Sequence, residues 1–309
     1  MTTVFIDGAA GTTGLEIRER LAGRADLAIA TLPDDRRKDA RARAEALNDA
    51  NFVILCLPDD AAIEAVGLIR NDRTRVIDAS SAHRVAAGWT YGFPELVGAD
   101  AVRGAARVSN PGCYPTGFLA LVAPLVRAGL VPADWPLTVN AASGYSGGGK
   151  AMVAEYESGA APAFRAYATT LAHKHLPEMA RHAGLAHPPI FAPAVADTYR
   201  GMVVEVPLHL HALPDRPSPA ALHDALAAFY AGQPLVTVAD PAATIAIEEN
   251  AGTDRLTLRV CGNADTGQVR LIATLDNLGK GAGGAAVQNL NIMAGLDPLA
   301  GLSLSRTSP

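Results

Sequence analysis

The sequence has few cysteines, no excess of positive charge and no long hydrophobic run. Three cysteines in 309 residues are too sparse for the disulfide framework of a secreted protein, so we expect a reducing, cytoplasmic location. With 26 Lys and Arg against 31 Asp and Glu, the formal net charge of −5 gives no general attraction for nucleic acid or anionic membranes. No apolar stretch approaches the roughly 20 residues that span a bilayer, and the N-terminus has no signal-peptide pattern. These features predict a soluble protein with neither nucleic-acid nor membrane partners.

The content of hydrophobic residues is that of a folded protein. They make up 49% of the chain and charged residues 18%, which excludes disorder over most of its length. Because domains average about 150 residues, the length predicts two domains. Neither needs disulfides or a metal ion for stability at this size.

The first hundred residues alternate apolar runs with helical patterns. The runs at 3–7, 27–32, 52–57 and 75–80 suit strands of a parallel sheet that is covered on both faces. They predict a Rossmann-type, doubly wound α/β domain. Later, a helix at 116–129 and period-two segments at 202–213, 244–249, 255–264 and 269–278 predict an α+β domain on a mixed or antiparallel sheet. We assign residues 1–113 and 284–309 to the Rossmann domain, and residues 114–283 to a catalytic and oligomerisation domain.

The segment GAAGTTG has the glycine spacing of a dinucleotide fingerprint between a strand and a helix. Gly8 permits the tight turn, Gly11 lets the backbone approach a pyrophosphate, and Gly14 allows close packing of helix and strand. The phosphates would lie at the helix N-terminus, beside Thr12 and Thr13. A plain loop is the alternative interpretation.

Basic residues near the end of the second predicted strand favour NADP over NAD. NAD sites usually have an acidic side chain there to bind the ribose, whereas this strand ends in Thr31, Leu32 and Pro33 and is followed by Arg36, Arg37 and Lys38. We assign Arg36 to the cofactor site. Alternatively, the three cations only solvate the start of a helix.

Cys113 is the candidate nucleophile. It lies in SNPGCYPTG at the start of an apolar helix, where the helix dipole and unpaired amides lower the pKa of a thiol. Cys56 and Cys261 lie within predicted strands, so we interpret both as small buried hydrophobes.

Two histidines in LAHKHLPEM, His173 and His175, are candidates for proton transfer, because reduction of an enzyme-bound thioester needs an acid and base. Metal binding is the rival interpretation, but no cysteine pair or HExxH motif supports zinc, and we predict no metal site. His209 and His211 have the same spacing on an alternating strand, where we expect a structural role.

Three further segments are candidates for a ligand pocket. SSAHR supplies Ser80 for the cofactor and Arg84 for a phosphate or carboxylate. SGYSGGGK supplies Ser143 and Lys150 for an anionic substrate, and DNLGKGAGG supplies Asn277 for the nicotinamide carboxamide. In each, turn chemistry alone is the alternative.

Together, GAAGTTG, SNPGCYPTG, SGYSGGGK, HKHLPEM and NLGKGAGGAAVQNLN resemble the shorter form (type 2) of the N-acetyl-gamma-glutamyl-phosphate reductases. These belong to the aspartate-semialdehyde dehydrogenase-like group. The resemblance runs from residue 4 to about residue 293. It implies a homo-oligomeric enzyme of arginine biosynthesis that reduces an acyl phosphate with NADPH.

In that family Cys113 matches the residue that attacks the acyl phosphate, forming a thioester that hydride reduces to the semialdehyde. His173 matches the acid/base histidine and His175 a substrate contact, although the HxH spacing leaves open which is which. Other hypotheses are a reductase of aspartyl phosphate, a non-catalytic dinucleotide-binding regulator, and a cysteine hydrolase or acyltransferase. A regulator would leave the cysteine without a function, and a hydrolase or acyltransferase would leave the glycine fingerprint without one.

Overall fold

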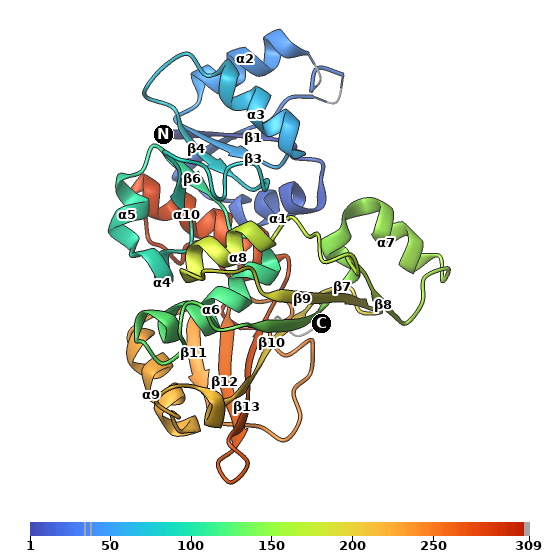
Figure 1. Cartoon of the computed structure of the whole chain (residues 1–309). Coiled ribbons are helices and arrows are strands. Elements are labelled where there is room, and N and C mark those ends of the chain that lie inside the picture. The colour runs from blue at the N-terminus through green and yellow to red at the C-terminus, as the bar shows by residue number, and fades with distance from the viewer. Residues whose placement is uncertain (34, 38, 306–309) are drawn as a thin grey trace. The chain divides into compact units, whose positions relative to one another are not determined.

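The computed structural model describes residues 1–33, 35–37 and 39–305, which form two compact units (Figure 1). The first contains Met1–Gly112 and Ala282–Leu302, and the second contains Cys113–Gly281 and the described residues from Ser303 onward. The chain thus passes from the first unit to the second immediately before Cys113 and returns after Gly281. The predicted division into domains stays a prediction.

The first unit is built on a parallel sheet. Within the described residues it has six strands in the order β2-β1-β3-β4-β6-β5, namely β1 (Thr2–Asp7), β2 (Leu27–Ala30), β3 (Phe52–Leu55), β4 (Arg75–Asp78), β5 (Thr90–Tyr91) and β6 (Arg107–Ser109). Its helices are α1 (Thr12–Leu21), α2 (Ala40–Asp49), α3 (Asp59–Leu68), α4 (Pro94–Val97), α5 (Ala99–Gly104) and α10 (Gly284–Ala294).

Both faces of this sheet are buried, which explains why its strands read as continuous apolar runs. Val4 and Ile6 of β1 lie in a core with residues of α1 and α10, whereas Phe5 lies in a second core with residues of α2 and α3. Each such side chain contributes about 1.5–3 kcal/mol of burial free energy. The Rossmann-type prediction is confirmed, and the carboxyl ends of β1 and β2 lie together at the glycine loop, where this fold binds ligands.

The second unit is built on a mixed sheet with strands in the order β11-β12-β13-β10-β7-β9-β8. These are β7 (Thr138–Gly144), β8 (Phe164–Ala166), β9 (Ile190–Ala196), β10 (Met202–His209), β11 (Val236–Ala239), β12 (Leu256–Asn263) and β13 (Gln268–Leu275). The helices are α6 (Cys113–Arg127), α7 (Gly149–Glu157), α8 (Leu176–Ala183) and α9 (Pro219–Phe229). A π-helix at Gly279–Gly283 begins in this unit and ends in the first.

One face of the mixed sheet lies against α6 and α9 (Figure 1). On β10, Val204, Val206 and Leu208 are buried, whereas Val203 and Glu205 point to the other face and are partly exposed. This alternation is the period-two pattern of the sequence, and the prediction of a mixed sheet is confirmed.

The strand predicted at 244–249 is wrong. The segment begins as irregular chain and ends in a turn, in which the backbone N–H of Glu249 donates to the carbonyl of Ala246 and that of the following Ala251 donates to the carbonyl of Glu248. The carboxylate of Glu249 pairs with Arg259 of β12 at 2.6 Å. The segment thus contacts β12 through this side chain and not through the backbone hydrogen bonds of a paired strand. The sheet ends instead at β11, which the sequence analysis missed together with α8, α9 and β9.

No helix in the described part of the chain combines the length and the hydropathy needed to cross a membrane.

Candidate functional site

The glycine loop of the first unit lines two neighbouring cavities. One, of about 340 Å³, is lined by Gly8, Gly11, Thr31 and Arg37 among others. The other, of about 170 Å³, is lined by Gly11, Thr12, Thr13 and Gly14, together with Cys56, Leu57 and Ala79. All five predicted residues of the fingerprint therefore line these cavities at the N-terminus of α1, where backbone amides favour an anion.

The three glycines of the loop have different steric roles. A Cβ on Gly8 would lie 2.3 Å from the Cys56 carbonyl oxygen, and the φ of +86° there already favours glycine. A Cβ on Gly14 would lie 2.5 Å from the Gly8 carbonyl oxygen, whereas a Cβ on Gly11 would meet that oxygen at an ordinary 3.5 Å. Gly8 and Gly14 are thus needed by the fold, and Gly11 is left for a ligand. The loop fits a dinucleotide pyrophosphate.

Two arginines line the larger cavity beside the end of β2. One is Arg18, which belongs to α1, and the other is Arg37, which follows β2; both are exposed. Arg36, which we predicted to bind cofactor, is exposed and is not among the lining residues; its backbone N–H donates to Pro33. Lys38 lies outside the described residues.

Ser80 and Arg84 are both buried in the first unit. The Ser80 hydroxyl donates to Asp78 at 2.7 Å. The Arg84 guanidinium donates to the carbonyl oxygens of Asn110 (3.0 Å) and Ala79 (3.1 Å). Arg84 thus ties the segment after β4 to the SNPGCYPTG segment, three residues before Cys113.

In the second unit, Cys113 is the first residue of α6 and is partly exposed. The helix begins here because Pro111 and Gly112 end the preceding extended chain, and it continues as a buried apolar run. The thiol is therefore attached to the helix N-terminus, the position that stabilises a thiolate.

His173 and His175 lie side by side before α8, with ring centroids 4.6 Å apart. His175 is buried and His173 is partly exposed. The backbone N–H of His175 donates to Nδ1 of His173 at 3.1 Å. A neutral His173 must therefore carry its proton on Nε2.

Two tyrosines that the sequence analysis missed complete this cluster. Tyr114, next to Cys113, is buried, and its ring centroid lies 6.2 Å from that of His173 and 6.0 Å from that of His175. Its hydroxyl donates to Ala194 of β9 at 3.0 Å. Tyr167 has its ring 5.7 Å from that of His173.

The pKa values of both phenols connect them to Cys113. Burial raises the pKa of Tyr167 to about 12, and the charge of the Cys113 thiolate adds to the rise. Burial likewise raises the pKa of Tyr114, with contributions from Tyr167 and Cys113. Both tyrosines therefore stay protonated at neutral pH. His173 and His175 therefore share one cluster of rings with Tyr114 and Tyr167, and Cys113 precedes Tyr114 in the chain and acts on both phenols through its charge. Only the position of Tyr114 beside Cys113 could have indicated this cluster from the sequence.

The remaining predicted residues of the second unit lie on β7, on α7 and in the loop after β13, and of these Ser143 is a side-chain hydrogen-bond partner of Tyr114. Ser143, at the end of β7, is buried and donates to the Gly144 carbonyl at 3.0 Å. Lys150 is exposed on α7. Asn277 is buried and its amide bonds two other loops: Oδ1 accepts from the Gly201 N–H, and Nδ2 donates to Ser146.

The other cysteines and histidines form separate features. Cys56, predicted to be buried within a strand, instead follows β3, is partly exposed and lines both cavities of the glycine loop. Desolvation of its thiol, together with the charges of Asp78 and Asp7, raises its pKa to about 12. His209 and His211 have ring centroids 5.5 Å apart, and His209 lines a cavity of about 360 Å³ with Cys261. Among the described residues, no cluster of three or more His, Cys, Asp or Glu side chains could hold a metal ion.

Comparison with known proteins agrees with this arrangement. Residues 3–105 match the family model described as semialdehyde dehydrogenase, NAD binding domain, and residues 113–277 match semialdehyde dehydrogenase, dimerisation domain. Solved structures with the same fold include a probable aspartate-semialdehyde dehydrogenase from Pseudomonas aeruginosa (TM-score 0.73, 17% identity, 95% of this chain and 98% of that chain). Another is aspartate semialdehyde dehydrogenase II complexed with ASA from Vibrio cholerae (TM-score 0.71, 15% identity, 95% and 98%).

Closer relatives share half of the sequence. An N-acetyl-gamma-glutamyl-phosphate reductase from Burkholderia ambifaria is 54% identical over 303 residues, covering 95% of this chain and 96% of the relative. N-acetyl-gamma-glutamyl-phosphate reductase 2 from Pseudomonas putida is 51% identical over 302 residues, covering 94% and 96%. The chain therefore belongs to the N-acetyl-gamma-glutamyl-phosphate reductase family of semialdehyde-dehydrogenase-type oxidoreductases.

Proposed function

We propose that the chain reduces N-acetyl-gamma-glutamyl phosphate to N-acetylglutamate 5-semialdehyde and phosphate, with NADPH, in arginine biosynthesis. The observation that carries this proposal is the cluster at the start of α6, where Cys113 lies beside Tyr114 and the ring of Tyr114 contacts both His173 and His175. A thiol at a helix N-terminus with histidines nearby suits covalent catalysis on an acyl group.

Cys113 would attack the acyl carbon as a thiolate. A carbon–sulfur bond forms, the bond between the acyl carbon and the phosphate oxygen breaks, and inorganic phosphate leaves with the bonding electrons. NADPH, when bound, supplies the hydride that reduces the resulting thioester carbon. The thiohemiacetal then collapses when the carbon–sulfur bond breaks, which regenerates the Cys113 thiolate and releases the aldehyde.

His173 would exchange the proton of the substrate oxygen through Nε2. Because Nδ1 accepts from the His175 backbone, Nε2–H can stabilise the negative oxygen that develops at the thioester carbon. A second proton on Nδ1 would face that backbone N–H, so proton transfer requires this hydrogen bond to break. We assign the acid/base role to His173 and the neighbouring substrate contact to His175.

The glycine loop of the first unit would hold the cofactor pyrophosphate at the N-terminus of α1, beside Thr12 and Thr13. For the ribose phosphate of NADPH, Arg37 is a better candidate than Arg36, because Arg37 lines the cavity beside Thr31. An arginine can grip such a phosphate with two parallel hydrogen bonds. Arg37→Ala should raise KM for NADPH by about tenfold and leave KM for NADH nearly unchanged.

The residues proposed to bind the substrate come from the sequence motifs alone. Arg84, Ser143 and Lys150 are the candidates for the phosphate and carboxylate, and Ser80 and Asn277 for the cofactor. The N-acetyl group removes a positive charge, so the substrate pocket needs no carboxylate to pair with an ammonium. An aspartyl phosphate would need one.

The reaction can be tested in reverse. Purified protein, NADP and N-acetylglutamate semialdehyde should give an increase in NADPH absorbance that depends on phosphate or arsenate, and aspartate semialdehyde should give little. Cys113→Ser should abolish the signal and still bind NADPH. Equal turnover of aspartate semialdehyde would move the proposal to the alternative substrate. Absence of any response with either dinucleotide, together with an unreactive Cys113 thiol, would favour a non-catalytic regulator.

We also propose that a second copy of this chain covers part of the mixed sheet. A cavity of about 580 Å³ lies on β7–β9 and is lined mostly by apolar residues. Large exposed hydrophobic residues lie in or beside it, namely Phe164 (61% exposed), Leu171 (54%) and Ile190 (55%). Apolar patches of this kind mark protein interfaces. Phe164→Glu should shift the protein towards monomer in light-scattering chromatography. An unchanged mass would contradict this interface.

A further inference from the structure

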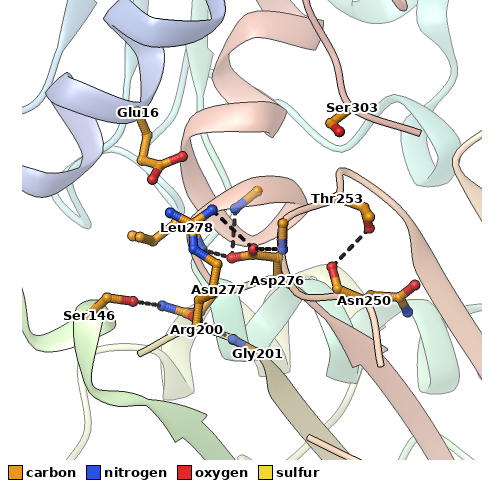
Figure 2. A network of polar contacts seen from close by, with 12 residues as sticks. Glu16, Ser146, Arg200, Gly201, Asn250, Thr253, Asp276, Asn277, Leu278 and Ser303 are labelled. Atoms are coloured by element: carbon orange, nitrogen blue, oxygen red, sulfur yellow. Dashed lines mark hydrogen bonds and ion pairs between the residues drawn. The ribbon is translucent and has the colours of Figure 1, made fainter. Parts of the chain in front are cut away.

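A fully buried carboxylate fixes the loop that follows β13 (Figure 2). Oδ1 of Asp276 accepts the backbone N–H groups of Leu278 (2.8 Å) and Gly279 (3.2 Å). Oδ2 accepts the N–H of Gly252 at 2.6 Å and lies 3.4 Å from the guanidinium of Arg200. Because a buried carboxylate is stable only with such partners, this loop is held in one conformation.

The next residue joins the same loop to two others (Figure 2). Oδ1 of Asn277 accepts the backbone N–H of Gly201 at 2.9 Å, and Nδ2 donates to the hydroxyl of Ser146 at 2.9 Å. Ser146 is buried within SGYSGGGK. The loops after β7, before β10 and after β13 are therefore connected by side chains that are remote in sequence.

The end of this loop lies directly against Cys113. The backbone N–H of Gly281 donates to the Asp276 carbonyl at 2.9 Å within the π-helix. A Cβ on Gly281 would lie only 2.9 Å from Cβ of Cys113, and a Cβ on Gly279 would lie 2.3 Å from the Thr253 carbonyl oxygen. Both glycines are needed because the backbone lies against its neighbours without space for a side chain. π-Helices of this kind often occur at functional sites.

We propose that Asp276 is a positioning residue for Cys113. By fixing the turn that leads to Gly281, its carboxylate holds the backbone against the Cβ of Cys113 and restricts the directions in which the sulfur can point. The proposal rests on the proposed function, in which Cys113 is the nucleophile. A nucleophile misplaced by about 1 Å can lose on the order of 100-fold in rate.

Two substitutions disturb this contact in opposite ways. Asp276→Asn preserves the size of the side chain, and its Oδ1 can still accept from Leu278 and Gly279. Its new NH₂ group would face the N–H donors of Gly252 and Arg200, so the contacts of residue 276 with these two residues should break. Gly281→Ala instead adds a methyl group against Cys113.

Each variant is tested by its rate of Cys113 alkylation with iodoacetamide, located by peptide mapping, and by kcat and KM. Asp276→Asn should expose the thiol and speed alkylation, whereas Gly281→Ala should cover it and slow alkylation. Both should lower kcat by about 10- to 100-fold. The affinity for NADPH should change little, because the glycine fingerprint belongs to the first unit.

Leu226→Ala provides the matched control. Leu226 is fully buried in α9 of the same unit, so this variant lowers stability without touching the Asp276 loop. It should leave the alkylation rate and kcat near the parent values at a temperature where all variants are folded. A purely structural role for Asp276 predicts the same behaviour for Asp276→Asn.

The outcomes separate this proposal from the proposed function. Full activity of Cys113→Ser would refute the proposed function and leave Asp276 without a nucleophile to position. An inactive Cys113→Ser with unchanged kcat in Asp276→Asn would refute the positioning role alone. If Asp276→Asn does not fold, Gly281→Ala decides: parent-like alkylation and kcat in that variant would refute the contact with Cys113.

Discussion

Gly11→Ala should weaken cofactor binding without harming the fold. Gly11 precedes α1 with φ of −74° and ψ of 167°, a conformation open to any L-residue. Apart from chain neighbours, the Gly8 carbonyl oxygen at 3.5 Å is the one described heavy atom that lies within 4 Å of an added Cβ. The methyl group would therefore occupy the cavity where we place the pyrophosphate.

The expected magnitudes follow from these distances. Alanine is a poorer helix N-cap than glycine by roughly 0.5 kcal/mol, and the loss of chain entropy in the unfolded state offsets this by about 0.4–1 kcal/mol. The free energy of unfolding should thus change by less than about 1 kcal/mol. If the backbone approaches the pyrophosphate closely, NADPH affinity should fall by at least about tenfold, which corresponds to ~1.4 kcal/mol.

Gly14→Ala is the contrasting variant. Its Cβ would lie 2.5 Å from the Gly8 carbonyl oxygen, about 0.9 Å closer than the 3.4 Å at which ordinary contact begins. This overlap should lower the free energy of unfolding by about 1–3 kcal/mol. Urea denaturation measures the stability of both variants, and quenching of protein fluorescence by NADPH measures binding. Parent-like NADPH affinity in Gly11→Ala would refute the placement of the pyrophosphate at this glycine.

Three further predictions concern single residues. At pH 8, iodoacetamide should label Cys113 and leave Cys56 intact, because desolvation raises the pKa of Cys56 to about 12; comparable labelling of both would contradict this. Asp39 caps α2 by accepting the N–H groups of Ala42 and Arg41, which hold its pKa below the ordinary 3.8. That stability is present above pH 3.8 and is lost as the pH falls through the lowered folded-state pKa. Asp39→Ala should therefore lower the melting temperature at pH 7, and the difference should shrink in acid; a constant difference would exclude the carboxylate. Gly67→Ala, exposed in α3 with open space around it, should stabilise the protein by about 0.5–1 kcal/mol in urea denaturation; destabilisation would contradict the helical conformation there.

Local sequence patterns predicted the parts of the molecule that local physics determines. The glycine spacing at residues 8–14 predicted the strand, loop and helix, and Gly11 and Gly14 meet atoms of the same β1–α1 turn, whereas Gly8 lies against Cys56, just after β3. The position of Cys113 after Pro111 and Gly112 predicted a helix that starts at the thiol. In both cases most of the deciding contacts lie within the motif itself.

Contacts between distant segments could not be predicted in this way. Tyr114 reaches Ala194, which is 80 residues away, and Arg200 reaches Asp276, which is 76 residues away. The alternation at 244–249 looked like a strand, but Glu249 instead turns towards Arg259. Arg36 and Arg37 are neighbours with the same chemistry, and only the fold determines which one lines the cavity.

The central claim is that Cys113 becomes acylated during the reaction. Incubation of the protein with N-acetylglutamate semialdehyde and NADP without phosphate should leave a thioester on Cys113, because the phosphate that releases the acyl group is missing. Intact-mass spectrometry should show one N-acetylglutamyl group per chain, peptide mapping should place it on Cys113, and added phosphate should remove it. NADPH formation with no acyl group on Cys113, or the same acylation in Cys113→Ala, would contradict the account.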